Sequence, residues 1–293
     1  MRYIEIKNIN EKTIKTLLKK NEFSKRAIDR LLKDGILLND KEIKSNLKIE
    51  KNDLIKIPID EENLDYEPIK GKINIKYEDE NLLIISKDSN ITVNSNGQVN
   101  LANYIAYYFK ENHIKAKVRF INRLDMNTSG LIMIAKNSYA QSFYQKEIED
   151  NGITKKYLAY VEGKLNIDKL YKIKLTYDEN SKRYDQAEDG KLAITYFKSL
   201  ETNEKYSIIE CDIKTGKTHQ IRSSLRYLGH PIIGDKLYGS TYDHDRFLLH
   251  SYYLKFNVFL KKESITIKDY PEFEGFVEKI WKYFSCKKIE NIL

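Results

Sequence analysis

Residues 120–136 read FINRLDMNTSGLIMIAK, in which a polar segment separates two apolar ones. The VRFI that ends at residue 121 and the LIMIA at 131–135 have the apolar, β-branched composition of sheet strands. The intervening NRLDMNTSG predicts a connection whose polar groups emerge at the sheet surface, with Thr128, Ser129 and Gly130 supplying turn chemistry. Arg123 and Asp125 therefore form either an ion pair that steadies a loop or part of a functional site.

Further strands of the same sheet are predicted from residue 72 onward. They are INIKYEDENLLIISKD, VRFI, GLIMIAK, KYLAYVEGKL, KYSIIECDIK and SYYLKFNVFL. In YSIIECDIK, Ser207, Ile209, Cys211 and Ile213 share one face, which predicts a half-buried strand. Helices are predicted at 138–150, 218–229 and 276–293. We expect an α+β domain with a mainly antiparallel mixed sheet, flanking helices and a central cleft.

A smaller α/β unit is predicted before this domain, over residues 1–60. RYIEIK and DLIKIPI alternate like strands, and TIKTLLKKN and SKRAIDRLLKDG read as helices, the second capped by Ser24 and ended near Gly35. The acidic stretch IDEENLDYEPIKG at 59–71 contains Pro68 and Gly71 and lacks apolar periodicity. We therefore place a linker at 61–71 and the large domain at 72–293.

Positive charge is concentrated in the predicted N-terminal helices. The whole chain of 293 residues has a net charge of +8, whereas residues 11–33 alone contain eight Lys or Arg against three Asp or Glu. Helical spacing places Arg26, Arg30 and Lys33 on the side opposite the apolar residues of the second helix. A cationic helix surface of this kind suits a polyanion such as nucleic acid.

Several classes of protein are not supported by the sequence. The two cysteines, Cys211 and Cys286, have no C-x-x-C spacing, and the five histidines show no metal-binding motif, so we expect no disulfide framework and no metal. The segment Gly216-Lys217-Thr218 resembles the end of a phosphate-binding loop, but Cys211 occupies the required glycine position. No signal peptide or membrane span is apparent, which predicts a cytoplasmic protein.

Two further segments contain candidate site residues. In GKTHQIRSSLRYLG, His219, Arg222 and Arg226 lie on one side of the predicted helix, as either a solvated face or a site for phosphates or a catalytic carboxylate. In ITKKYLAYVEGKL, Tyr157 begins an apolar strand after two lysines. Its ring either caps the core or stacks on an unstacked nucleobase.

Taken together, these segments resemble the RluA/RluD family of RNA pseudouridine synthases. The resemblance runs from about residue 75 to 260 and is carried by YEDENLLIISKDSNITVNSNG, NRLDMNTSGLIMIAK, KKYLAYVEG, GKTHQIRSSLRYLGHPIIGDKLYG and FLLHSYYLKF. The N-terminal unit is similar to the RNA-binding domain named after ribosomal small-subunit protein S four. Two segments depart from the family pattern: Asn122 stands where histidine is usual, and Asp88-Ser89-Asn90 replaces Pro-Ala-Gly.

The resemblance implies isomerisation of uridine to pseudouridine in RNA, without a cofactor. It implies a catalytic role for Asp125, an arginine partner in Arg222 and a base-packing tyrosine in Tyr157. Large-subunit rRNA is the favoured substrate, tRNA is the alternative, and we expect a monomer. The RNA-binding residues expected from charge and position are Arg123, His219, Arg226, Arg26, Arg30 and Lys33.

Two other functions are compatible with the residues. The departures at Asn122 and Asp88 are compatible with a factor that binds RNA without turnover. A hydrolase that uses Asp125 and His219 would release free uracil or cleave the chain.

Overall fold

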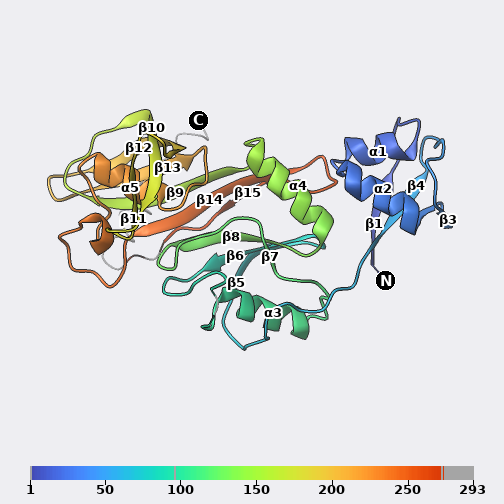
Figure 1. Ribbon diagram of the computed structural model, residues 1–293, viewed down its shortest axis with the longest axis horizontal. Helices are drawn as coiled ribbons and strands as arrows, with labels where there is room; N and C mark the ends of the chain where they lie inside the picture. Colours follow the sequence, from blue (N-terminus) through green and yellow to red (C-terminus); the bar gives the residue numbers. More distant parts are fainter. Residues whose placement is uncertain (1, 96, 272, 274–293) are drawn as a thin grey trace, which may run out of the picture.

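The structure is a computed structural model that describes residues 2–95, 97–271 and 273 (Figure 1). The helix predicted at 276–293 and Cys286 lie outside the described residues. Within the described part of the chain, none of the helices combines the length and apolarity needed to cross a bilayer.

The N-terminal residues form a four-stranded antiparallel sheet with two helices. The elements are β1 (Arg2–Lys7), α1 (Ile14–Lys20), α2 (Lys25–Asp34), β2 (Ile36–Leu38), β3 (Lys41–Ile43) and β4 (Leu54–Ile59), and the strand order is β1-β4-β2-β3. The Ser24 hydroxyl accepts a hydrogen bond from the Ala27 backbone N–H, and Gly35 ends α2, as predicted. Ile28, Leu31 and Leu32 are buried, so the apolar face of α2 was predicted correctly.

The large sheet contains eleven of the described strands in the order β11-β10-β12-β13-β9-β14-β8-β6-β5, with β15 beside β14 and β7 beside β8. All of its pairings are antiparallel except the short parallel contact between β8 and β14, which confirms the predicted α+β class. The strands are β5 (Asn74–Glu78), β6 (Leu82–Lys87), β7 (Arg119–Phe120), β8 (Ser129–Ala135), β9 (Thr154–Glu162), β10 (Asp168–Asp178), β11 (Arg183–Gln186), β12 (Lys191–Thr202), β13 (Tyr206–Ile213), β14 (Leu249–Asn257) and β15 (Ser264–Lys268).

Helices cover both faces of this sheet. Leu83 and Ile85 of β6 pack with α3 (Leu101–Glu111), whereas Leu82 and Ile84 belong to the cluster that contains α4 (Ser138–Glu149). The third helix, α5 (Gln220–Tyr227), packs Leu225 into the cluster with Phe197 of β12. A short 3-10 turn, η1 (Lys236–Tyr238), follows α5. The helix α3 and the strands β10 to β12 were missing from the sequence prediction.

The prediction of a half-buried β13 was wrong. Ile209 and Cys211 face the cluster under α5, while Ile208 on the other face is buried with Tyr160 and Tyr252. Both faces are covered because an apolar cluster packs on each side of the sheet at β13. The alternation in the sequence reflects two apolar layers of different composition, and Glu210 on the second face is held by Lys156.

The N-terminal unit contacts the large domain through aromatic side chains. The Phe23 ring lies 5.3 Å from the ring of Tyr139 in α4 and 6.2 Å from that of Phe259, measured between centroids. The segment 61–71 has no helix or strand, but it follows the surface of the large domain. The backbone N–H of Glu62 donates to the Lys115 carbonyl and that of Ile69 to the Asn103 carbonyl.

The RLD-containing loop emerges where two neighbouring strands separate. β14 pairs with β8 only at Ser129 and Gly130, and β7 then takes the place beside β8. Gly130 has φ 108°, and a Cβ on it would lie 2.3 Å from the Ser251 carbonyl oxygen, so the close approach of β14 requires glycine. Ser129 and Gly130 therefore begin β8 rather than forming the predicted turn, which closes through the Thr128 N–H and the Asp125 carbonyl.

Candidate active site

Two carboxylates from different segments share one guanidinium group. Arg222 of α5 donates from Nη1 to Oδ2 of Asp125 at 3.0 Å, and from Nε and Nη2 to the two carboxylate oxygens of Asp235 at 2.7 and 2.9 Å. The bidentate bond to Asp235 fixes the plane of the guanidinium, which leaves Nη1 directed at Asp125. The structure thus brings Asp125 and Arg222 together, although they are 97 positions apart in the sequence.

Arg222 lies inside the protein, so the predicted cationic stripe on α5 is not a solvent-exposed face. The residue is 5% exposed, and its guanidinium carbon lies 4.2 Å from the ring centroid of Phe247 and 4.9 Å from that of Tyr238. Burial alone would lower the pKa of Arg222, but the hydrogen bonds and charges of Asp235 and Asp125 outweigh burial and raise it. Arg222 is therefore a permanent cation on a fixed support.

His219 precedes α5 and also faces Asp125. It is the N-cap residue, with a left-handed φ of 54°, and its Nε2 lies 3.7 Å from Asp125 Oδ2. Nδ1 contacts the Tyr238 hydroxyl at 3.0 Å. Burial and the charge of Arg222 lower the pKa of His219, against the opposing effect of Asp125 and Asp235, so the ring is neutral near pH 7. Arg222 is therefore the cation that balances Asp125 here.

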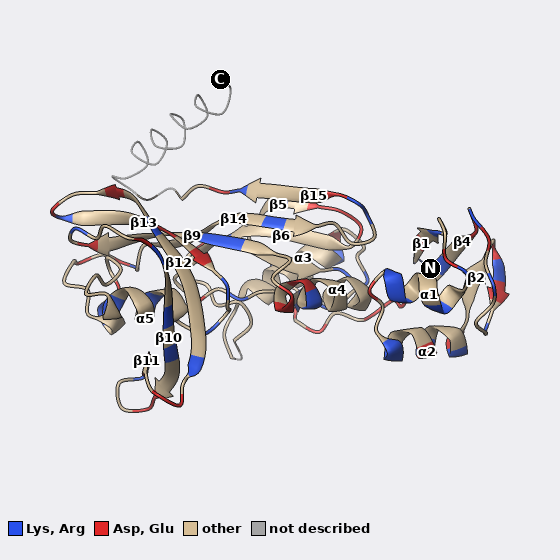
Figure 2. Cartoon of the chain, turned by 90° about the horizontal axis from the view of Figure 1, so that it is seen from above, with Lys and Arg blue, Asp and Glu red and all other residues tan. Residues whose placement is uncertain are grey.

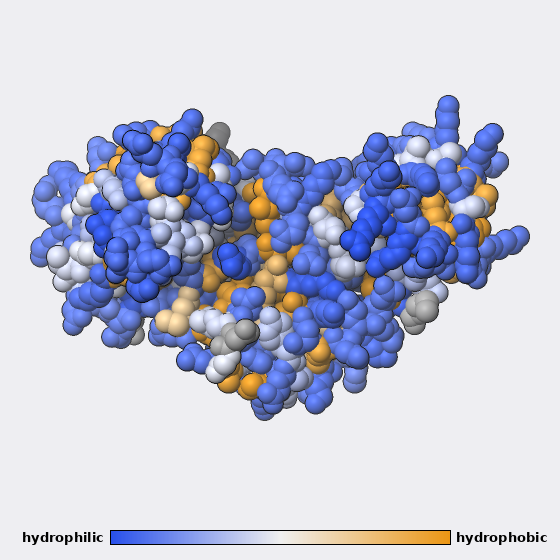
Figure 3. All heavy atoms as spheres, in the orientation of Figure 1, coloured by the Kyte–Doolittle hydropathy of each residue, from blue (hydrophilic) through white to orange (hydrophobic). Residues whose placement is uncertain are grey.

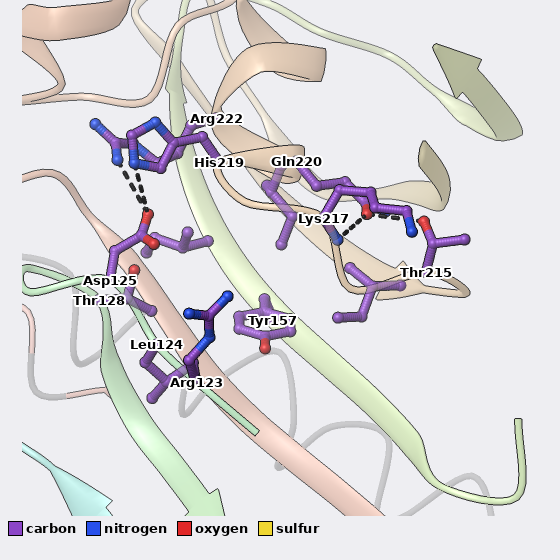
Figure 4. A pocket seen from close by; sticks show the side chains of 13 residues that line it. Arg123, Leu124, Asp125, Thr128, Tyr157, Thr215, Lys217, His219, Gln220 and Arg222 are labelled. Carbon is purple, nitrogen blue, oxygen red and sulfur yellow. Dashed lines mark hydrogen bonds and ion pairs between the residues drawn. The ribbon is translucent and has the colours of Figure 1, made fainter. Parts of the chain in front are cut away.

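An open pocket lies beside this ion pair (Figure 4). Its empty volume is about 410 Å³, a figure that includes solvent at the open mouth. Tyr157 of β9 presents its ring to the pocket, and burial raises the pKa of its phenol well above the usual range. Arg123 and Lys217 also line the pocket. In the view of Figure 3, apolar side chains are exposed in the middle of the large domain between hydrophilic regions.

Arg123 is suited to bind a substrate group. Its side chain is exposed, and within residues 2–95, 97–271 and 273 it makes no ion pair or hydrogen bond. The alternative in which Arg123 and Asp125 form an ion pair that steadies the loop is therefore wrong, because Asp125 pairs with Arg222 instead.

Lys87 and Asn122 hold the two ends of the loop that carries Asp125. The Lys87 ammonium, 1% exposed, donates to the backbone carbonyls of Asp88, Ile91 and Met126 at 2.8–2.9 Å. Burial lowers its pKa to about 7, while Asp125 and Asp88 act in the opposite direction. The Asn122 carbonyl oxygen accepts from the Met133 N–H at 2.9 Å. The two departures from the family pattern thus lie in segments that support Asp125.

The remaining predicted RNA-binding residues lie apart from the pocket. Arg226 donates to Asp185 at 2.9 Å and is partly buried. Arg30 donates to the Tyr139 hydroxyl at 3.1 Å, so it joins the N-terminal unit to α4. Arg26 and Lys33 are exposed on α2 and, in the described residues, have no carboxylate partner.

Asp235 and Lys87 were missed by the sequence analysis. Asp235 lies between a glycine and a lysine in a segment read only as a loop, yet it is 1% exposed. Lys87 ends an apolar strand and is followed by a turn, a position usually taken by a solvated lysine. No three His, Cys, Asp or Glu side chains in the described residues are grouped as metal ligands.

Comparison with known proteins identifies the family. The family model described as RNA pseudouridylate synthase matches residues 81–227, which include Asp125, Tyr157 and Arg222. The chain belongs to the RNA pseudouridylate synthase family. It is 36% identical over 212 residues to the RNA pseudouridine synthase YhcT of Bacillus subtilis, covering 70% of each protein.

Other relatives place the chain within this family. It is 35% identical over 251 residues to the ribosomal large subunit pseudouridine synthase C of Buchnera aphidicola, covering 81% of this chain and 80% of that protein. The fold matches the solved structure of human RNA pseudouridylate synthase domain containing 1, with a TM-score of 0.60 and 23% identity over 71% of this chain and 87% of that one. The predicted RluA/RluD resemblance and the class of enzyme, a pseudouridine synthase, are confirmed.

Proposed function

We propose that this pseudouridine synthase isomerises specific uridines of large-subunit rRNA, with Asp125 as the catalytic carboxylate. One observation carries the proposal: the Asp125 carboxylate lines an open pocket together with Tyr157, while a buried guanidinium fixes its position. A carboxylate that must act on one atom of a large substrate needs such a rigid support. The relatives named for the ribosomal large subunit support the choice of RNA.

The proposed reaction changes the connectivity of the nucleotide without changing its composition. The bond between N1 of uracil and C1′ of ribose breaks, the base rotates in the pocket, and C5 bonds to C1′. C5 then loses its proton and N1 gains one, so no oxidant, reductant or energy source is consumed. Asp125 serves either as the nucleophile at C1′ or as the base that removes a ribose proton.

The pocket residues supply the remaining functions in this proposal. The target uridine is extruded from its strand, and the flat ring of Tyr157 packs against the base. Because burial keeps the Tyr157 phenol protonated, the hydroxyl is a donor rather than an anion at neutral pH. Arg123 either enters the space that the uridine leaves or binds a phosphate, and such phosphate contacts offset the cost of extrusion.

We assign the N-terminal residues 1–60 to an S four type RNA-binding domain, with 61–71 as the linker and 72–293 as the catalytic domain. The support is the exposed positive charge on α1 and α2, whose Lys and Arg residues are blue in Figure 2. Arg26 and Lys33 are two of the cations on that surface that have no carboxylate partner within the described residues. His219 is better explained as a support of the pocket, and Arg226 as a partner of Asp185, than as phosphate ligands.

The test is the identity of the product. Purified protein is incubated with unmodified large-subunit rRNA of its own source, tritiated at uridine C5, and released label is counted. We expect label release, unchanged RNA mass and new pseudouridine in the digested nucleosides. Free uracil or a cleaved chain would show a hydrolase instead. If neither label nor uracil appears while the RNA still binds, the protein is a binding factor and the proposal is wrong.

A further inference from the structure

Lys155 of β9 is a buried lysine whose ammonium lacks a partner. It is 8% exposed, and within the described residues it makes no ion pair and no hydrogen bond. The two other buried lysines are satisfied: Lys87 by three backbone carbonyls, and Lys136 by Glu78 and the Asp79 carbonyl. Burial accordingly lowers the pKa of Lys155, with no acidic neighbour to oppose it.

Lys155 shares a face of β9 with the pocket residue Tyr157 but does not itself line the pocket, and its partner across the sheet, Leu254, packs in the cluster with α4. Side chains two residues apart point to the same face, about 6–7 Å apart along a strand, so Lys155 follows the direction of Tyr157. The intervening Lys156 points to the opposite face, where it bonds Glu210 at 2.9 Å. In the register of β9 and β13, Asp212 stands opposite Lys156, which places the pocket residue Ile213 beside Lys155. Figure 2 shows this stretch of β9 in blue at the centre of the molecule.

Burying an ammonium group without a hydrogen-bond partner costs free energy, so such a group in a native protein needs an explanation. A bound ligand that accepts its hydrogen bonds is one such explanation. Its complement is an anion with hydrogen-bond acceptors. Asp125, the carboxylate of the pocket, is already committed to Arg222. The exposed cations Arg123 and Lys217 line the same pocket, so the site as a whole has an excess of positive charge.

We propose that Lys155 binds a phosphate of the RNA backbone next to the target uridine, an inference that rests on the proposed function. The phosphate would accept hydrogen bonds from the ammonium and pair with it in a site of low dielectric. Lys155 would thereby anchor the strand on the Tyr157 side while Asp125 acts on the ribose. It is a binding residue, not a catalytic one.

The test compares Lys155→Met with Lys156→Met, two charge removals on neighbouring residues that face opposite sides of β9. Affinity for the substrate rRNA, its salt dependence, label release and thermal midpoint are measured for both. For Lys155→Met we expect about tenfold weaker binding, a salt slope smaller by about 0.7, a raised KM and an unchanged or higher thermal midpoint. For Lys156→Met we expect a lower midpoint, because Glu210 loses its partner, and unchanged RNA affinity.

Lys155→Arg should restore most of the affinity, since it restores the positive charge. The inference is overturned if Lys155→Met binds RNA as the wild type does, with the same salt slope. It is equally overturned if Lys155→Met and Lys155→Gln both lower the thermal midpoint and lose affinity in proportion to unfolding, because the role is then structural. Should the wild type bind rRNA but release no label, the proposed function fails, while the affinity and salt slope still decide the role of Lys155.

Discussion

Asp235 illustrates how a residue outside the pocket determines the geometry inside it. Its two carboxylate oxygens accept hydrogen bonds from Nε and Nη2 of Arg222, and the remaining nitrogen, Nη1, donates to Asp125. Both members of the Arg222–Asp235 pair are at most 5% exposed. Removing one member of such a pair leaves a buried charge without its main partner, which is costly.

We therefore expect Asp235→Ala to lower the free energy of unfolding by about 3 kcal/mol. Turnover should fall as well, because Arg222 is free to turn away from Asp125. The control is Asp125→Ala, in which Arg222 keeps its bidentate bond and the loss of stability should be less than half as large. Urea unfolding of both variants measures the difference, and equal losses would contradict the proposed support.

Three of the residues that the sequence predicted for the site lie together in the structure, while their catalytic roles stay predictions. Asp125, Tyr157 and Arg222 stand in recognisable motifs, and the structure brings all three to one pocket. The sequence left open whether Arg222 lies on a solvated face or in a site, because helical spacing reports which side a residue faces, but not what covers that side. Asp235, which lies in a turn 13 residues after Arg222, covers that side of the helix. No local sequence pattern predicts this contact.

At the scale of elements, His250 connects the start of β8 to the end of β15. Its Nδ1 lies 2.8 Å from the Ser129 hydroxyl, and its Nε2 lies 2.9 Å from the Asp269 carbonyl and 3.3 Å from Asp269 Oδ2. Lys76 of β5 reaches the other oxygen of Asp269 at 2.7 Å. Burial alone would raise the pKa of Asp269, but hydrogen bonds from His250, Lys76 and Ser86 outweigh it and lower the pKa to about 2.

This shift predicts how stability depends on pH. The folded-state pKa of Asp269 lies below its unfolded value, so the unfolded chain binds more protons between about pH 2 and 4, and stability rises with pH there. We expect Asp269→Asn to be less stable than the wild type by about 2 kcal/mol at pH 6. At pH 3 the difference should be clearly smaller. Urea titrations at both values test this, and a constant difference would show that the carboxylate charge is not responsible.

Most elements with a clear period were predicted, but α3, whose signals are mixed, and β10, whose period is clear, were not. α3 has Leu101, Ile105 and Phe109 at helical spacing and Asn100 as its N-cap, but its three tyrosines have the composition of a strand. The strand β10 alternates Tyr171, Ile173 and Leu175 with lysines, a pattern that was available in the sequence but overlooked. β13 looked half-buried because periodicity distinguishes two faces without showing whether both are covered.

At the scale of the whole molecule, the N-terminal unit and the pocket are held at a fixed spacing. Phe23 and Arg30 join the N-terminal unit to Tyr139 of α4, and segment 61–71 is bonded along the large domain. The sequence predicted two units and an intervening linker, but not this contact, because Phe23 looks like an ordinary core residue. In our proposal the same RNA contacts the α2 surface and the pocket. The N-terminal unit then contributes to RNA affinity, and the pocket carries out the isomerisation.

The most direct test of this account measures RNA affinity and label release together for the full-length wild type and Asp125→Asn. The variant keeps the shape of the side chain and the Arg222–Asp235 pair. We expect its affinity for rRNA and the salt dependence of that affinity to change less than threefold, while release of tritium from uridine C5 falls below detection. Label release from Asp125→Asn at a rate within tenfold of the wild type would show that another group carries out the chemistry.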